Sequence, residues 1–228
     1  MFLATLLFAT GRRRRPITLR ISGPRGPLRF TVPDYAAMRV LGEVFVKREY
    51  AIELDSPPAT VVDLGASTGA SSLFFRCRYP EARIVAVEAS PALVELLRSN
   101  TSELDVEVRH AAVAPAAGTA TFFEADESWA GSTTIRVGTP VEVPAITLDE
   151  LLDKPVDLVK MDLEGAEFDV LPAARRLTQM RALICELHAA PGTAASRRVL
   201  DRLDGFEVSI DVEHSDPFTL FTAVRRGA

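Results

Sequence analysis

The chain has 228 residues, of which 47% are hydrophobic and 25% charged, a composition typical of one folded globular domain and not of a disordered chain. Its net charge of −5 is unevenly distributed, because residues 1–30 carry seven arginines and no acidic residue. The acidic remainder lacks the clustered lysines and arginines of a phosphate-binding face, which argues against a nucleic-acid partner. Cys77 and Cys185 lie far apart in apolar runs without metal-ligand or disulfide spacing, which favours buried thiols and a cytoplasmic protein.

The N-terminal segment joins an apolar stretch, Met1–Ala9, to four arginines, Arg12–Arg15. A secretory signal carries its positive charge before the apolar stretch, and crossing a bilayer takes about 20 apolar residues, so the segment fits neither. Two interpretations stay open: a short helix packed on the core with a solvated basic end, which we favour, and a weak membrane contact through residues 1–15. We expect residues 1–55 to form an N-terminal extension, with a β-hairpin at 17–32 and a helix, before a main domain at 56–228.

Strand-like and helix-like segments alternate from residue 60 onward, which predicts an α/β fold with a mostly parallel, seven-stranded sheet and helices on both faces. The expected strands are 60–64, 83–88, 106–113, 156–161 and 182–187, followed by an antiparallel pair at 206–212 and 218–224. The expected helices are 70–79, 91–100, 147–152, 166–177 and 194–203. Short β-prone pieces at 119–123, 133–137 and 141–146 predict an antiparallel excursion within residues 115–146.

A glycine-containing loop follows the first strand of the main domain, in the segment Asp63-Leu64-Gly65-Ala66-Ser67-Thr68-Gly69. Ligands of an open parallel sheet bind at the carboxyl ends of its strands, where glycines let the backbone approach them closely. Ser67 stands where a pyrophosphate-binding loop needs its middle glycine. S-Adenosylmethionine has no phosphate. Its amino and carboxylate groups need an acceptor and backbone amides, which Asp63 and the loop backbone can supply. The loop therefore favours this cofactor, with a predicted binding set of Asp63, Gly65, Ala66, Ser67 and Gly69.

An acidic residue, Glu88, ends the second strand, where an acid hydrogen-bonds the ribose hydroxyls of a nucleoside. A solvated glutamate at a strand end is the alternative, but the order of strand, glycine loop, helix, strand and acid favours a nucleoside site. We expect Ala89 to contribute to this site. After the third strand, His110 opens a turn where a backbone contact to adenine is expected, and Ala111 completes the predicted set.

Charged residues gather at the ends of the last two parallel strands. Lys160, Asp162 and Glu164 share one side of the chain while it stays extended, a costly arrangement unless the charges are paired or used. Glu186 and His188 share a face of the next strand. The candidate catalytic residues are Asp162, Glu164 and His188, with His188 as a metal-free general base because imidazole has a near-neutral pKa. Three alternatives stay open: a divalent-metal site of Asp162, Glu186 and His188, which we do not favour, a loop cap by His188, and a salt-bridged cluster that only positions the loop.

Four segments together resemble the FkbM family of methyltransferases, namely Val62–Gly69, Val87–Pro91, Ile146–Asp149 and Lys160–Glu167. The resemblance extends from about residue 59 to 188, and the Lys-x-Asp-x-Glu-Gly-x-Glu block is its most specific part. It implies a Rossmann-like class I methyltransferase fold, S-adenosylmethionine as cofactor, and O-methylation of a hydroxyl on a small-molecule acceptor such as a sugar, glycolipid or polyketide-type natural product. Ser67-Thr68 departs from the family, which often has Asn-Ile or a similar pair there, but binding through backbone amides should survive the change.

Two other functions use the same fold. A nicotinamide-dependent oxidoreductase would need the middle glycine, which this loop lacks, and a catalytic Tyr-x-x-x-Lys or similar group. A non-catalytic binding module would have no reason to keep both the intact loop and the acid at residue 162. We expect residues 30–55 and 115–146 to shape the acceptor pocket. Within the first of these segments, Glu43 and Tyr50 are expected near the methyl end of the cofactor.

Overall fold

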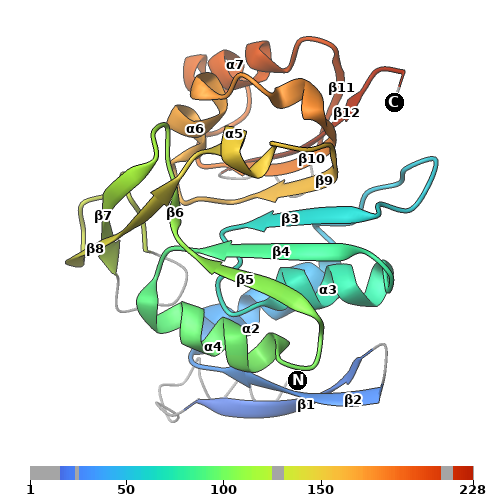
Figure 1. Ribbon diagram of the computed structural model, residues 1–228, viewed down its shortest axis with the longest axis vertical. Helices are drawn as coiled ribbons and strands as arrows, with labels where there is room; N and C mark the ends of the chain where they lie inside the picture. Colours follow the sequence, from blue (N-terminus) through green and yellow to red (C-terminus); the bar gives the residue numbers. More distant parts are fainter. Residues whose placement is uncertain (1–15, 24–25, 125–130, 212–217, 228) are drawn as a thin grey trace.

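The computed structural model describes residues 16–23, 26–124, 131–211 and 218–227, and its centre is a seven-stranded sheet (Figure 1). The strands are β3 (Thr60–Leu64), β4 (Arg83–Glu88), β5 (Val106–His110), β9 (Val156–Met161), β10 (Met180–Leu187), β11 (Phe206–Ile210) and β12 (Thr219–Arg225). In the order β11-β12-β10-β9-β3-β4-β5, the five strands from β10 to β5 are parallel, and β12 is antiparallel to both of its neighbours. This sheet confirms the predicted Rossmann-like topology and its terminal antiparallel pair.

Helices cover both faces of this sheet. They are α2 (Tyr35–Gly42), α3 (Ala70–Arg78), α4 (Pro91–Thr101), α5 (Leu148–Leu151), α6 (Glu167–Ala173) and α7 (Ala194–Leu200). The predicted start signals are confirmed. The Ser90 side chain accepts a hydrogen bond from the amide of Leu93, with Pro91 in the first helical turn, and Thr147 and Glu150 form a capping box at α5.

A second, three-stranded sheet of order β6-β8-β7 forms the predicted antiparallel excursion, with β6 (Ala112–Val113), β7 (Gly118–Glu124) and β8 (Thr139–Ile146). The single strand predicted at 106–113 is wrong. The last hydrogen bond between β4 and the chain after β5 runs from the amide of Ala111 to the carbonyl of Glu88, and from Ala112 the chain pairs instead with β8, as β6. The strand predicted at 133–137 is also wrong, because these residues form no strand. Ser132, just before them, makes an isolated β-bridge to Phe123.

Two predicted helices are longer than the observed ones. The helix predicted at 166–177 ends at Ala173, because Pro172 has no amide hydrogen to donate and Ala174 is extended. A separate 3-10 turn, Leu177–Gln179, follows it. The helix predicted at 194–203 becomes 3-10 helical from Asp201.

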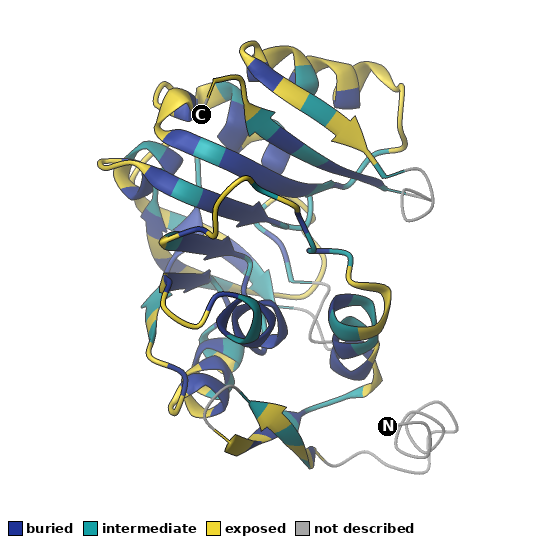
Figure 2. Ribbon diagram, turned by 90° about the vertical axis from the view of Figure 1, so that its right-hand side faces the viewer, coloured by how far each residue is buried: buried dark blue, intermediate teal, exposed yellow. Residues whose placement is uncertain are grey.

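The residues before the main sheet form the predicted hairpin, β1 (Ile17–Gly23) paired with β2 (Gly26–Val32), then α2 and a π-helical turn at Glu43–Lys47. Figure 2 shows the alternating exposure of the hairpin, which turns one face to the protein. The side chain of Asn100 is buried, and its Oδ1 accepts a hydrogen bond from the amide of Thr31. Its Nδ2 donates to the carbonyls of Thr31 and Thr68. The hairpin is therefore tied to the glycine-containing loop.

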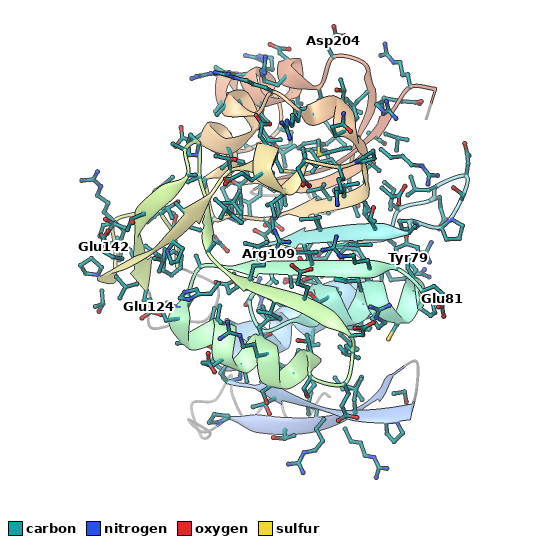
Figure 3. The ribbon with its side chains drawn as sticks, viewed as in Figure 1. Tyr79, Glu81, Arg109, Glu124, Glu142 and Asp204 are labelled. Atoms are coloured by element: carbon teal, nitrogen blue, oxygen red, sulfur yellow. The ribbon has the colours of Figure 1, made fainter. Side chains whose placement is uncertain are left out.

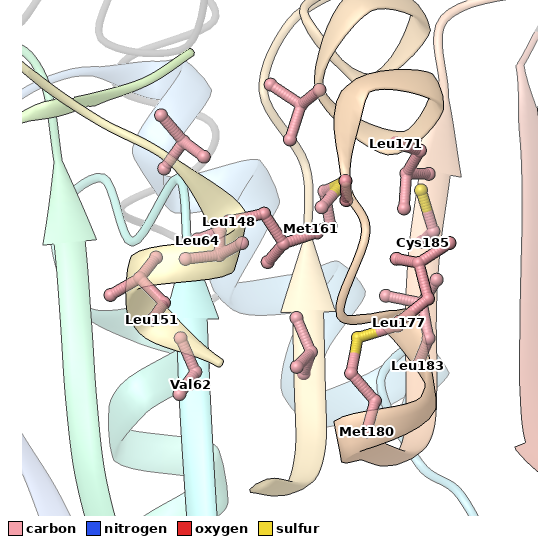
Figure 4. Packing of buried hydrophobic residues seen from close by; sticks show 14 of the residues in the cluster. Val62, Leu64, Leu148, Leu151, Met161, Leu171, Leu177, Met180, Leu183 and Cys185 are labelled. Atoms are coloured by element: carbon pink, nitrogen blue, oxygen red, sulfur yellow. The ribbon is translucent and has the colours of Figure 1, made fainter. Parts of the chain in front are cut away.

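Alternate residues of the central strands build two hydrophobic cores. Val62 and Leu64 of β3 lie in the core that α5 and α6 cover, as Figure 4 shows, whereas Val61 lies in the core shared with α2, α3 and the hairpin. Both faces of each central strand are thus buried, as expected of a parallel sheet. Among the described helices, none has the length and hydropathy needed to cross a membrane. The interpretations of residues 1–15 lie outside the described residues.

Candidate active site

The site is a cavity of about 310 Å³ at the carboxyl ends of β3, β4 and β9. The chain proceeds from β3 to β4 and β5 on one side and later adds β9 and β10 on the other, so the strand order reverses between β3 and β9. Such a reversal opens a crevice that binds ligands in this fold class. The three-stranded sheet stands beside this end of the main sheet (Figure 1), and its residues complete the cavity wall.

The glycine-containing loop forms the floor of the cavity. A Cβ atom on Gly65 would lie 1.8 Å from the carbonyl oxygen of Asp162, so only glycine lets the loops after β3 and β9 meet. Ser67 has a φ of 49°, in the left-handed region that asparagine tolerates better, so the departure from the family pattern carries a backbone cost. The amides of Gly65 and Ala66 both donate to the carbonyl of Val87, which holds the loop against β4.

Glu88 joins this loop to the start of α4. Its Oε2 accepts from the amide of Ser67 at 2.8 Å, and its Oε1 accepts from the amide of Ser90, also at 2.8 Å. Burial raises the pKa of Glu88, and the backbone hydrogen bonds oppose this shift. Each carboxylate oxygen keeps a second lone pair, and the side chain lines the cavity, so Glu88 can still accept hydrogen bonds from a ligand.

Asp63 lies beneath the loop and outside the cavity lining. It is fully buried, and its Oδ2 accepts hydrogen bonds from the hydroxyls of Ser71 and Ser72. Its Oδ1 is 3.6 Å from Nζ of Lys160, which donates to the carbonyl of Gly65 at 2.8 Å. The prediction that Asp63 accepts from the cofactor's amino group is therefore not supported by its position, because its contacts support the loop from below.

Lys160 is 2% exposed and faces two carboxylates, those of Asp63 and Asp162. Burial lowers the pKa of Lys160, but the negative charges of Asp162 and Asp63 outweigh burial and raise it. Its ammonium group also lies 5.1 Å from the ring centre of Tyr50. The lysine thus stays charged and links the loops after β3 and β9.

Tyr50 reaches the cavity from the segment before β3, as predicted. Its hydroxyl donates to Oδ2 of Asp162 at 3.1 Å, and both side chains line the cavity. Burial and the charge of Asp162 raise the pKa of Tyr50 well above its usual value, so it remains a donor. Glu43, predicted beside it, instead pairs with Arg39 and Lys47 and does not line the cavity.

His188 lies between two carboxylates. Its Nε2 is 3.0 Å from Oε2 of Glu164, and its Nδ1 is 3.3 Å from Oε1 of the fully buried Glu167. Burial opposes protonation of the imidazole, but the interactions with Glu164 and Glu167 outweigh it and raise the pKa of His188 to about 11. The near-neutral pKa expected from the sequence is therefore wrong, and His188 does not line the cavity.

Glu164 does line the cavity, in front of His188. Burial raises the pKa of its carboxyl group, and the hydrogen bond with His188 opposes the shift. Its backbone has a left-handed φ of 52°, and its carbonyl accepts from Ser132 Oγ at 2.7 Å and from Thr134 Oγ1 at 3.3 Å. This clamp has no signal in the sequence, because no local pattern relates residues 132 and 164.

A candidate metal cluster in the described part of the chain consists of Asp162, Glu164 and His188, whose ligand atoms lie within 4.8 Å of one another. Glu186, the third ligand predicted from the sequence, is replaced in this cluster by Glu164. Oδ1 of Asp162 is buried without a hydrogen-bond partner among the described residues, which suits a cation. Nε2 of His188, however, already contacts Oε2 of Glu164 at 3.0 Å, which leaves Nδ1 as the buried His188 atom without a hydrogen-bond partner among the described residues.

We expect Glu186→Gln to stabilise the protein in mildly alkaline solution. Burial and the charge of Asp162 raise the pKa of Glu186 to about 8, from an ordinary value of 4.5. Between these values the folded state binds more protons than the unfolded state, so the wild-type free energy of unfolding falls as pH rises. Urea unfolding at about pH 5 and 8 should show a smaller fall in the variant, by about 1 kcal/mol or more. The exposed Glu207→Gln is the control, and equal falls in all three proteins would contradict the prediction.

Comparisons with known proteins bear on the family and the fold of the chain. The sequence profile described as the methyltransferase FkbM domain matches residues 63–217. The chain is 25% identical to methyltransferase sdnD of Sordaria araneosa over 86% of this chain and 93% of that protein. It is also 25% identical to the 2-O-methyltransferase NoeI of Sinorhizobium fredii over 72% of this chain and 78% of that protein. Among solved structures, Aeropyrum pernix fibrillarin with bound S-adenosyl-L-methionine has a TM-score of 0.52 at 14% identity, covering 94% of this chain and 85% of that one, a likeness of fold.

Proposed function

Because the chain belongs to the FkbM family of methyltransferases, we propose that it transfers a methyl group from S-adenosylmethionine to a hydroxyl oxygen of a small-molecule acceptor. The observation that carries the cofactor assignment is the pairing of the Gly65 loop with Glu88 along one cavity wall. A loop with backbone amides and a strand-end acid suits a nucleoside without phosphates. The acceptor class we propose is a sugar, glycolipid or polyketide-type hydroxyl, which accords with the 2-O-methyltransferase name of one relative.

The two ends of the cavity have different chemistry. Glu88 and the loop amides lie at the end that we assign to the ribose and the amino-acid part of the cofactor. Asp162, Tyr50 and Glu164 lie at the end formed by β9, which we assign to the transferred methyl group and the acceptor. Bound S-adenosylmethionine supplies a methyl group made electrophilic by its sulfonium charge. The protein has to place the acceptor oxygen in line with the carbon–sulfur bond and remove its proton.

We assign the removal of the acceptor's hydroxyl proton to Glu164 and not to His188. Glu164 lines the cavity, whereas His188 stands behind it and is protonated at neutral pH. A carboxylate whose pKa is raised by burial is a better base than an exposed one. Bound S-adenosylmethionine would supply the methyl group to the hydroxyl oxygen and keep the electron pair of the broken carbon–sulfur bond, and Glu164 would take the proton that the oxygen loses. The products are the methyl ether and S-adenosylhomocysteine.

This route uses no metal ion, since the His188 imidazolium already neutralises Glu164. Asp162, Glu164 and His188 are the residues that would hold a divalent ion, which would polarise the acceptor hydroxyl. This ligand set is only moderately suited to magnesium or manganese, because these ions prefer oxygen ligands and His188 offers an imidazole nitrogen. Methyl transfer should therefore persist in EDTA. Complete loss of activity with EDTA and recovery with magnesium or manganese would replace this route with a metal-dependent one.

Binding experiments test the cofactor assignment before an acceptor is known. We expect S-adenosylhomocysteine and S-adenosylmethionine to raise the thermal unfolding temperature, because a ligand that binds only the folded state stabilises it. NAD should give no shift, since the loop lacks the close approach that a pyrophosphate needs. A shift with NAD alone would favour the oxidoreductase. Cofactor binding without methyl transfer to any sugar, glycolipid or polyketide hydroxyl offered would favour a non-catalytic module.

A further inference from the structure

Beyond Glu88, the cavity continues between apolar walls. The first turn of α4 contributes Leu93, the segment after β5 contributes Ala111 and Ala112, and β7 contributes Phe122. These side chains offer no hydrogen bond to a ligand. A slot of this kind, next to the acid assigned to the ribose, suits a flat heterocycle attached to that ribose.

One carboxylate, Glu124, stands at the rim of this slot. It is the last residue of β7, and in Figure 3 it lies near the start of α4. Its Oε1 accepts a hydrogen bond from the hydroxyl of Ser90 at 2.8 Å and lies 3.5 Å from the amide nitrogen of Ala92. Its Oε2 has no hydrogen-bond partner among the described residues. An ionised carboxylate can only accept, so Oε2 is available to a donor on the ligand.

The residue that the sequence places nearest to the base is not available for this contact. His110 ends β5, but its Nε2 lies 3.0 Å from the carbonyl oxygen of Ala89, and the side chain does not line the cavity. Of the other acidic residues that line the cavity, Asp34 caps α2 by accepting from the amide of Ala37, and Glu88 is bonded to the loop and to Ser90. Asp162 and Glu164 lie at the β9 end. Glu124 is therefore the acidic lining residue on the far side of Glu88, beside the apolar slot.

We propose that Glu124 accepts a hydrogen bond from the exocyclic amino group of the adenine base and so selects adenosine over inosine derivatives at this site. The inference rests on the proposed cofactor. Adenine presents a donor at its 6-amino group, whereas hypoxanthine presents an acceptor oxygen at the same position. Two acceptors that face each other away from water repel and leave both groups without a partner. Discrimination between the bases therefore follows from the charge and position of one side chain.

The test compares the affinities of S-adenosylhomocysteine and S-inosylhomocysteine by calorimetry. Wild-type protein should bind the adenosyl compound at least about tenfold more tightly, the range expected for a lost hydrogen bond to a charged group. Glu124→Gln should abolish or invert this preference, because the amide can donate to the 6-oxo group while its oxygen still accepts from Ser90. Glu142→Gln is the matched control, since Glu142 lies on neighbouring β8, is exposed and bonds Thr121 (Figure 3).

A wild-type preference retained in Glu124→Gln would overturn the proposal and leave Glu124 as a cap of α4. If that variant does not fold, Glu124→Asp supplies the test. The shorter carboxylate should weaken binding of the adenosyl compound, while its preference over the inosyl compound is kept. Unchanged affinity for the adenosyl compound in Glu124→Asp would also overturn it. Failure of the proposed function has a different signature, because wild-type protein would then bind neither compound.

Discussion

Glu164→Gln should lower kcat by about 100-fold or more, the range typical of removing a general base. The amide cannot take the acceptor proton, although it has nearly the shape of the carboxylate. Affinity for S-adenosylhomocysteine should change by less than about fivefold, because Glu164 lies at the β9 end of the cavity and not beside Glu88. Turnover and calorimetry on the same preparation separate these two effects. A fully active variant would remove Glu164 from the chemical step.

The pH dependence of turnover distinguishes Glu164 from His188 as the base. A base works when deprotonated, so activity rises as pH passes its pKa. With Glu164 as the base, the rise occurs above the ordinary glutamate pKa of 4.5 and well below 11. With His188 as the base, activity would keep rising toward pH 11.

His188→Ala sharpens this contrast. Removing the imidazolium takes away the positive charge that opposes the raised pKa of Glu164, so the rise in activity should move to higher pH. At pH values above the new pKa, much of the turnover should return. Loss of activity by about 100-fold at every pH would instead assign the proton transfer to His188. Asp162→Asn provides the comparison, since it should lower kcat at every pH by weakening the contacts with Tyr50 and Lys160.

Local signals predicted the fold well, and they indicated two segments that line the cavity, the glycine-containing loop and the end of β4. The capping box at Thr147 and Glu150, the N-cap at Ser90 and the glycine-containing loop each act within a few residues of chain, where physical preferences are strong. Glu88 was predictable as a cavity residue because strand order alone brings a strand-end acid next to the loop. Where a proline interrupts an element, as Pro172 does, the predicted helix was too long.

Contacts between distant segments could not be predicted in the same way. Tyr50 was expected near the methyl end from its position before β3, but its bond to Asp162 spans 112 positions and has no sequence pattern. The role of Asp63 depended on Ser71 and Ser72, which turn the carboxylate into the helix and away from the cavity. The pKa of His188 depended on Glu164 and also on Glu167, the first residue of α6. In each case, tertiary packing set the electrostatics of a residue whose position had been predicted.

Glu88→Ala should weaken the binding of S-adenosylhomocysteine at least about tenfold, since charge-assisted hydrogen bonds are worth about 1.5–3 kcal/mol. The substitution also releases the amides of Ser67 and Ser90, so a loosened loop could weaken binding without any ribose contact. The 2′-deoxy analogue of S-adenosylhomocysteine separates the two causes in a thermodynamic cycle. If Glu88 bonds the ribose, wild-type protein should lose affinity for the deoxy compound, and Glu88→Ala should bind both compounds nearly equally. Equal losses for the deoxy compound in both proteins would leave Glu88 as a loop anchor and remove it from the nucleoside site.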